Sequence, residues 1–357
     1  MLNYRNFEHL ELNFSRRINC FAGDNGVGKT NLLDAIFYLS FCKSALNSID
    51  SQVIYHGADC FMLKGFYKTP DGETLVISSS VRLKSRKRFR CGDKDYQRFS
   101  DHIGVIPLVM VSPADSALIE GGSDERRRFM DMVISQCDKE YLSLLIDYVR
   151  ALAQRNALIR QDSDIDDELF LVWEEIMART GEAIYKKRKQ FVESLKPLFQ
   201  SVYSAIGTDR EAVSFEYSSH AVEGSLLEQL KESRPKDRII GYSLRGVHKD
   251  DLIMTLDGFP IKREGSQGQN KSCLVALKLS QYLYLSDLSP NRKPILLLDD
   301  LFDKLDALRV EKILNIVSDE RFGQIFITDV NCDYLDKMLR KKGKEFKLFT
   351  VEYGKVI

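Results

Sequence analysis

Eight residues near the start of the chain carry the clearest chemical pattern. Residues 23–30 read GDNGVGKT and match G-x-x-x-x-G-K-[ST], the Walker A phosphate loop. Glycines let such a loop curl so that successive backbone N–H groups point at phosphate oxygens. Lys29 can reach the β- and γ-phosphates of a nucleotide, and the Thr30 hydroxyl can ligate Mg²⁺. The pattern predicts a nucleoside-triphosphate site, and its candidate residues are Gly23, Asp24, Asn25, Gly26, Val27, Gly28, Lys29, Thr30 and Asn31.

A second pattern is a pair of acids at the end of an apolar run. Residues 294–300 read PILLLDD, and a continuous apolar run indicates a strand buried on both faces, as in a parallel sheet. Ligands of such sheets bind at the carboxyl ends of the strands. Asp299 can therefore hold Mg²⁺ through water, and Asp300 can polarise the attacking water as a general base. We expect Lys29, Asp299 and Asp300 to carry catalysis. Thr328 ends the next buried strand, at 324–329, where a γ-phosphate sensor would lie.

Two further candidates lie outside these motifs. Arg5 is close to the phosphate loop in sequence and could reach a nucleotide phosphate, although a surface arginine is an equally good interpretation. The segment SQGQ precedes a helical pattern, about 30 residues before the strand at 294–300. A serine that caps a helix N-terminus is well placed to contact phosphate. The residues of this segment are Ser266, Gln267, Gly268 and Gln269.

A basic run lies between residues 82 and 98. Its charge is a clear local excess, although the formal net charge of the chain is zero. Such a run can track a phosphate backbone, where each neutralised phosphate releases a counterion. The alternative is a solvated hairpin that protects a sheet edge with charge. We expect DNA contact from Arg82, Lys84, Arg86, Lys87, Arg88 and Arg90.

The elements that position these residues follow from hydrophobic periodicity. The phosphate loop stands between a buried strand, Ile18–Ala22, and a helix, Asn31–Leu39, which is the context the motif requires. Further strands are expected at 10–14, within 61–90 and at 105–111, 213–217 and 252–256. Ser123, after a glycine pair, is expected to cap a helix, and helices are expected at 139–160, 166–206 and 225–233, with Trp173 in the core. The fold class is therefore α/β.

Composition excludes several other classes. The chain has 357 residues, of which 44% are apolar and 29% charged, as in soluble globular proteins with two domains or lobes. No apolar run approaches the length of a membrane span, and a signal-peptide profile is missing. The seven cysteines contain no C-x-x-C pair, which argues against a zinc site or a disulfide framework and suits a reducing cytoplasm. His248 beside Asp250 does not by itself make a metal site.

The order of the motifs is that of an ABC-type ATPase head, and the sequences resemble the RecF family of SMC-like ATPases. The resemblance covers nearly the whole chain. It rests on residues 2–7, 25–36, 123–131, 154–158, 266–269 and 296–306. The chain departs from the family pattern at Val247 and Lys249, where the family has proline and arginine, and at Ala114, where it has glutamate.

The resemblance implies an ATPase head with a mostly parallel sheet, additional antiparallel strands and an inserted helical lobe. Its divisions would be residues 1–112, 113–235 and 236–357. It further implies a weak, DNA-stimulated ATPase that uses ATP and Mg²⁺. In such heads Ser266 of one subunit caps the γ-phosphate held by Lys29 of another, so ATP drives a homodimer. The implied role is recombinational DNA repair, including the SOS response, in the cytoplasm: the dimer binds double-stranded DNA near single-strand gaps and, with RecR and RecO, promotes RecA loading.

Three alternatives stay open at the level of sequence. A transporter or translation-factor ABC subunit predicts an L-S-G-G-Q signature and Asp-Glu-Pro after the strand at 294–300, whereas the chain has Asp299-Asp300-Leu301. An SMC-type protein that bridges distant DNA needs long heptads, which the expected helical lobe lacks. The sequence does not exclude a DNA-binding module whose ATP site is purely structural.

Overall fold

The computed structural model describes residues 1–161, 166–207, 212–301, 305–330 and 345–357. The chain forms two compact units. The first contains Met1–Asp115 and Gln281–Ile357, and the second contains Ser116–Ser280. The boundaries predicted from the sequence, at 112/113 and 235/236, stay predictions.

A mostly parallel six-stranded sheet forms the centre of the first unit. Its order is β15-β14-β3-β13-β12-β8, and only the pairing of β15 with β14 is antiparallel. Every residue of β8 and β12 is buried, which explains their continuous apolar sequences. The strands are β3 (Ile18–Ala22), β8 (Leu108–Val111), β12 (Ile295–Leu298), β13 (Ile325–Asp329), β14 (Phe346–Glu352) and β15 (Lys355–Val356).

A second, antiparallel sheet completes this unit, in the order β2-β1-β4-β5-β6-β7. One face buries Phe61, Leu63, Ile77 and Phe89, and α1 (Lys29–Phe41) contacts β4 and β5 as well as β8 and β13 of the parallel sheet. Helix α9 (Ala307–Val317) follows β12. The strands are β1 (Leu2–Tyr4), β2 (Phe7–His9), β4 (Cys60–Lys68), β5 (Thr74–Arg82), β6 (Arg88–Cys91) and β7 (Lys94–Asp95).

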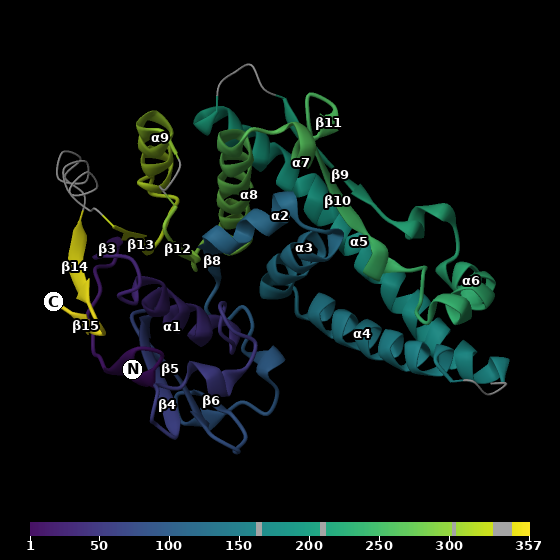
Figure 1. The fold of residues 1–357 in the computed structure, drawn as a ribbon, viewed down its shortest axis with the longest axis horizontal. Coiled ribbons are helices and arrows are strands. Elements are labelled where there is room, and N and C mark those ends of the chain that lie inside the picture. The colour runs from purple at the N-terminus through teal and green to yellow at the C-terminus, as the bar shows by residue number, and fades with distance from the viewer. Residues whose placement is uncertain (162–165, 208–211, 302–304, 331–344) are drawn as a thin grey trace. The chain divides into compact units, whose positions relative to one another are not determined.

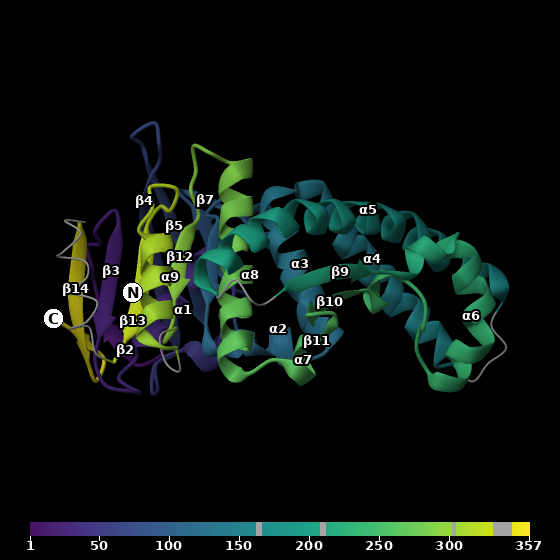
Figure 2. The same ribbon diagram turned by 90° about the horizontal axis from the view of Figure 1, so that it is seen from above.

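The second unit is a helical bundle with a small sheet. Helices α4 (Lys139–Ile159) and α5 (Asp167–Ile206) lie side by side, and α6 (Leu226–Ile240) contacts both (Figure 2). The sheet has the order β11-β10-β9, built from Phe259–Pro260, Asp251–Leu256 and Val213–Ser218. The remaining helices are α2 (Ala117–Glu120), α3 (Ser123–Cys137), α7 (Ile261–Glu264) and α8 (Gln267–Leu288), and α8 contains the boundary between the units.

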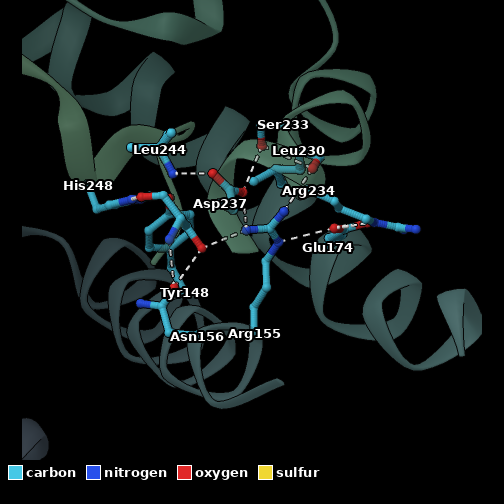
Figure 3. Close-up of polar contacts among 11 residues, drawn as sticks. Tyr148, Arg155, Asn156, Glu174, Leu230, Ser233, Arg234, Asp237, Leu244 and His248 are labelled. Carbon is cyan, nitrogen blue, oxygen red and sulfur yellow. Dashed lines mark hydrogen bonds and ion pairs between the residues drawn. The ribbon is translucent and has the colours of Figure 1, made fainter. Parts of the chain in front are cut away.

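A fully buried arginine holds α4, α5 and α6 together. Arg155 of α4 donates from Nε to Glu174 of α5 (3.1 Å) and from Nη1 to Asp237 of α6 (2.7 Å). It also donates to the Ser243 hydroxyl and to the carbonyl of Leu230, as Figure 3 shows in part. All three charged side chains have no solvent exposure. A buried charge is tolerable only when it is paired and hydrogen-bonded, and this arginine satisfies that condition.

A second buried arginine, on α5, ties α3 to the residue that precedes β10. Arg188 donates to Asp131 (2.8 Å) and to Asp250 (2.8 Å). Arg126 forms a two-bond pair with Asp251, at 2.6 and 3.0 Å. The segment 123–131, which carries part of the family resemblance, and the segment 246–251, which departs from the family pattern, therefore contact each other as structural partners.

Three sequence predictions about local structure were wrong. Residues 10–14 form no strand, and Phe14, which is 37% exposed, makes edge contacts with the rings of Phe21, Phe326 and Phe349. Ser123 is not the N-cap of α3, since that position is Gly122. Trp173 is only partly buried. Over the described residues, no helix is long and apolar enough to cross a membrane.

Candidate nucleotide-binding site

The phosphate loop joins the end of β3 to the first residue of α1. Gly28 occupies the N-cap position with φ +112°, in the left-handed region that only glycine adopts without strain. A Cβ at Gly28 would also overlap the side-chain amide of Asn6. The chain therefore enters α1 through a conformation and a contact that both require glycine.

Asn6 fixes this loop from outside, and the sequence did not identify it. Its Nδ2 donates to the carbonyl of Val27 (2.8 Å), and its Oδ1 accepts from Nδ2 of Asn31 (2.8 Å). The residue thus bridges the loop and the first turn of α1. The only available signal was its place in the family-like segment at 2–7, which gives no indication of a contact with residue 27.

Lys29 is folded onto its own loop. Its ammonium donates to the carbonyls of Gly23 (2.7 Å) and Asp24 (2.9 Å), and the residue is 4% exposed. These two bonds hold the ammonium group against the loop. The predicted contacts of Lys29 with the β- and γ-phosphates would replace them when a nucleotide binds.

The acids predicted at the end of β12 meet the phosphate loop directly. Asp299 accepts hydrogen bonds from the hydroxyls of Thr30 (3.0 Å) and Thr328 (2.8 Å). Three motifs that are far apart in sequence thus share one carboxylate. Burial raises the pKa of Asp299, and the two threonine bonds oppose that rise. Oxygen donors of this kind suit a hard cation such as Mg²⁺.

Asp300 follows in a strained conformation. Its φ is +43°, which is uncommon outside glycine, and its backbone N–H donates to the Thr328 hydroxyl (2.9 Å). The Thr328 hydroxyl therefore accepts a hydrogen bond from the backbone of Asp300 and donates one to the carboxylate of Asp299. This pair of bonds fixes the end of β13 against the end of β12.

Arg5 is held by side chains of the first unit. Its Nε and Nη2 donate to Asp34 of α1 (3.2 and 3.1 Å), and Nη2 also donates to the Ser44 hydroxyl. Asp34 is fully buried and also accepts from the Tyr4 hydroxyl. A contact between Arg5 and a nucleotide phosphate stays a prediction.

The SQGQ segment belongs to the second unit and forms a capping box at the start of α8. The Ser266 N–H donates to Oε1 of Gln269 (2.7 Å), and the Gln269 N–H donates to the Ser266 hydroxyl (3.3 Å). Ser266 and Gln267 are exposed, whereas Gly268 is partly buried. The first turn of a 22-residue helix thus presents a serine hydroxyl to solvent.

The basic run divides into residues with different partners. Lys87 pairs with Asp50 (2.7 Å) and lies over the rings of Tyr38 and Phe99. Arg88 and Arg90 both pair with Asp95 on β7. The other three predicted DNA contacts, Arg82, Lys84 and Arg86, are exposed at the end of β5 and in the turn that follows it.

Comparison with known proteins decides the family. The model of the RecF/RecN/SMC N terminal domain matches residues 1–354. The DNA replication and repair protein RecF of Phocaeicola vulgatus is 59% identical over 100% of this chain and 96% of its own length. The RecF of Porphyromonas gingivalis strain W83 is 46% identical, over 100% and 98%. The chain belongs to the RecF family.

Solved structures agree with this assignment. The recombination mediator protein RecF with ATP, from the RecFOR pathway, matches with a TM-score of 0.88 and 26% identity, over 99% of this chain and 95% of that one. A Smc head domain from Pyrococcus yayanosii matches with a TM-score of 0.60 and 14% identity, over 99% and 95%, a likeness of fold alone. The chain therefore has the mixed α/β fold of an ABC-type ATPase head, and its family consists of DNA replication and repair proteins.

Proposed function

We propose that this chain is an ATP-dependent DNA-binding protein of recombinational repair. The observation that carries the proposal is the carboxylate of Asp299, which accepts from both Thr30 and Thr328 and so joins the phosphate loop to two strand ends. RecF structures with ATP support the choice of ATP as the nucleotide.

Each residue of the site has a distinct role in this proposal. Backbone N–H groups of residues 23–30 cradle the phosphates, and Lys29 contacts the β- and γ-phosphates. The Thr30 hydroxyl donates a hydrogen bond to Asp299, which leaves a lone pair on its oxygen; Thr30 would ligate Mg²⁺ directly and Asp299 would hold the ion through water. When bound, Mg²⁺ neutralises charge on the phosphates. Asp300 polarises the attacking water.

ATP joins two copies of the chain in this proposal. Ser266 and the signature segment of one copy cap the γ-phosphate held by the other copy, and slow, DNA-stimulated hydrolysis releases the pair. Two features support this arrangement. Ser266 is exposed, and it stands at the N-terminus of α8, where the helix dipole favours an anion.

DNA lies on the exposed basic residues Arg82, Lys84 and Arg86 in this proposal, because the other three predicted DNA contacts, Lys87, Arg88 and Arg90, already have acidic partners. The DNA is double-stranded, near a single-strand gap, and the output is RecA loading with RecR and RecO. The RecFOR pathway named for the solved RecF structures supports these partners.

Light scattering tests the ATP-dependent dimer. We expect dimers with ATP, monomers with ADP, and monomers under both conditions for Ser266→Arg. The control is Ser289→Arg, which adds the same side chain at another exposed serine. A wild-type chain that stays monomeric with ATP would contradict the shared site.

Duplex binding at several salt concentrations tests the DNA surface. Charge reversal at Arg82, Lys84 and Arg86 should weaken binding and reduce the slope of log K against log salt by about 3, since each lost phosphate contact contributes about 0.9. The control reverses Lys231, Lys236 and Lys262, which are exposed in the second unit. Equal effects of the two triple variants would show a non-specific charge effect and would exclude this surface.

A further inference from the structure

The hairpin of β14 and β15 lies against the phosphate loop. Strand β14 pairs with β3 up to Thr350 and Ala22, immediately before Gly23, and Figure 1 shows β14 beside β3. A Cβ at Gly23 would overlap the carbonyl of Val351. The backbone of the hairpin therefore touches the first residue of the loop.

The turn of the same hairpin reaches a second part of the site. A Cβ at Gly354 would lie 2.5 Å from the carbonyl of Asn6. Asn6 in turn bonds to Val27 and approaches Gly28. Three turns thus meet here: the phosphate loop, the turn between β1 and β2, and the turn between β14 and β15.

Tyr353 occupies this turn at an energetic cost. The pairing of Glu352 with Lys355 leaves a two-residue turn, Tyr353-Gly354, with φ values of +37° and +80°. Such turns favour Asn, Asp or Gly at the position of Tyr353, because a larger side chain is strained at positive φ. The tyrosine is also 90% exposed and has no ring contact within the described parts of the chain. Neither backbone conformation nor packing explains an aromatic residue here.

The order of the parallel sheet places β14 and the acids on opposite sides of β3. Strand β3 lies between β13 and β14, and Asp299 and Thr328 lie at the β12 and β13 ends. The reacting γ-phosphate belongs on that side, beside the acids. The nucleoside end of the same molecule then lies toward the opposite side, where β14 and its turn flank the loop.

We propose that Tyr353 stacks on the base of the bound nucleoside triphosphate. This inference rests on the proposed nucleotide site and assigns the part of it that recognises the base. Stacking of a base on an aromatic side chain contributes about 1–3 kcal/mol and needs no hydrogen bond. Unfavourable backbone conformations cluster at ligand sites, where the surrounding structure maintains them.

Calorimetric titration of the full chain with ATP and with inorganic tripolyphosphate separates the base from the phosphates. We expect Tyr353→Ala to bind ATP about tenfold more weakly and Tyr353→Phe to bind it as the wild type does. Tripolyphosphate should bind equally to all three chains. Phe66→Ala, which removes another exposed aromatic ring, is the matched control and should leave both affinities unchanged.

A further variant separates stacking from turn stability. Asparagine tolerates positive φ, so Tyr353→Asn should raise the unfolding temperature slightly while it weakens ATP binding as alanine does. Three results would overturn the inference: ATP affinity unchanged in Tyr353→Ala, an equal loss for tripolyphosphate, or full ATP affinity in Tyr353→Asn. A wild-type chain that binds neither ligand would instead refute the proposed function itself.

Discussion

Replacement of Arg155 by methionine tests the buried ion network of the second unit. The substitution keeps an unbranched side chain of similar length but removes the charge from a site with no solvent exposure. Breaking a buried ion pair by removing one partner costs about 3–5 kcal/mol, because the other charge stays buried without compensation.

The structure places the expected cost at the lower end of that range. Glu174 keeps two bonds from Arg234, so it stays paired. Asp237 loses its only arginine and keeps bonds from the Ser233 hydroxyl and the Leu244 N–H. We therefore expect a loss of about 3 kcal/mol, or about 6–12 °C in the unfolding temperature of a unit of this size.

Fluorescence of the only tryptophan follows this unit, because Trp173 lies on α5 next to Glu174. Urea unfolding of Arg155→Met should show the loss, and adding Asp237→Asn should recover part of it by removing the unpaired charge. Arg160→Met is the control, since Arg160 is exposed and donates only to a carbonyl among its described contacts. A loss below 1 kcal/mol, or a double variant no more stable than the single, would refute the reasoning.

Three further predictions concern pH, catalysis and the loop. Burial lowers the pKa of His248 to about 4 from 6.5, so the unfolded chain binds the proton more readily between these values. The free energy of unfolding of the wild type should fall by about 2 kcal/mol from pH 7 to pH 5, and that of His248→Gln should fall less in the same urea titrations. Equal losses in the two chains would exclude this histidine as the cause. Asp300→Asn should lower ATP hydrolysis at least about 100-fold and leave ATP affinity unchanged, and undiminished phosphate release would rule out a general base there. Gly28→Ala should abolish calorimetric ATP binding, because its Cβ overlaps Asn6 and its φ is left-handed. The double variant Gly28→Ala, Asn6→Ala should lose the overlap but keep the strain of a left-handed φ at residue 28. Full recovery of ATP binding in the double variant would show that this strain is not a cause.

Local patterns predicted most of the fold. The strand at 18–22 was predicted with its observed bounds, and the helices at 139–160 and 166–206 differ from α4 and α5 by one residue at one end. These elements are long or strongly periodic, and burial of one face or both imposes their pattern. The strand at 10–14 failed because alternating apolar residues do not specify a backbone partner; the N–H of Leu10 bonds to Met1 instead.

The site residues that belong to a recognisable sequence pattern were predictable. Thr30, Asp299 and Thr328 were singled out from separate patterns, and the structure brings them together. Contacts between distant segments were not predictable, because nothing in residues 6 or 351 indicates the phosphate loop as a neighbour. The partners of the basic run were not predictable either. The sequence predicts Lys87 as a cation available to DNA, whereas in the structure it pairs with Asp50 and lies over two aromatic rings.

The contact between Gly23 and Val351 also constrains biosynthesis. The phosphate loop leaves the ribosome well before β14, which flanks it. The second unit, Ser116–Ser280, emerges before β12, β13 and β14 exist. A nascent chain therefore carries a phosphate loop without the strands that flank β3 until the segments after the second unit have been made, and the proposed nucleotide site is completed only once β14 has emerged.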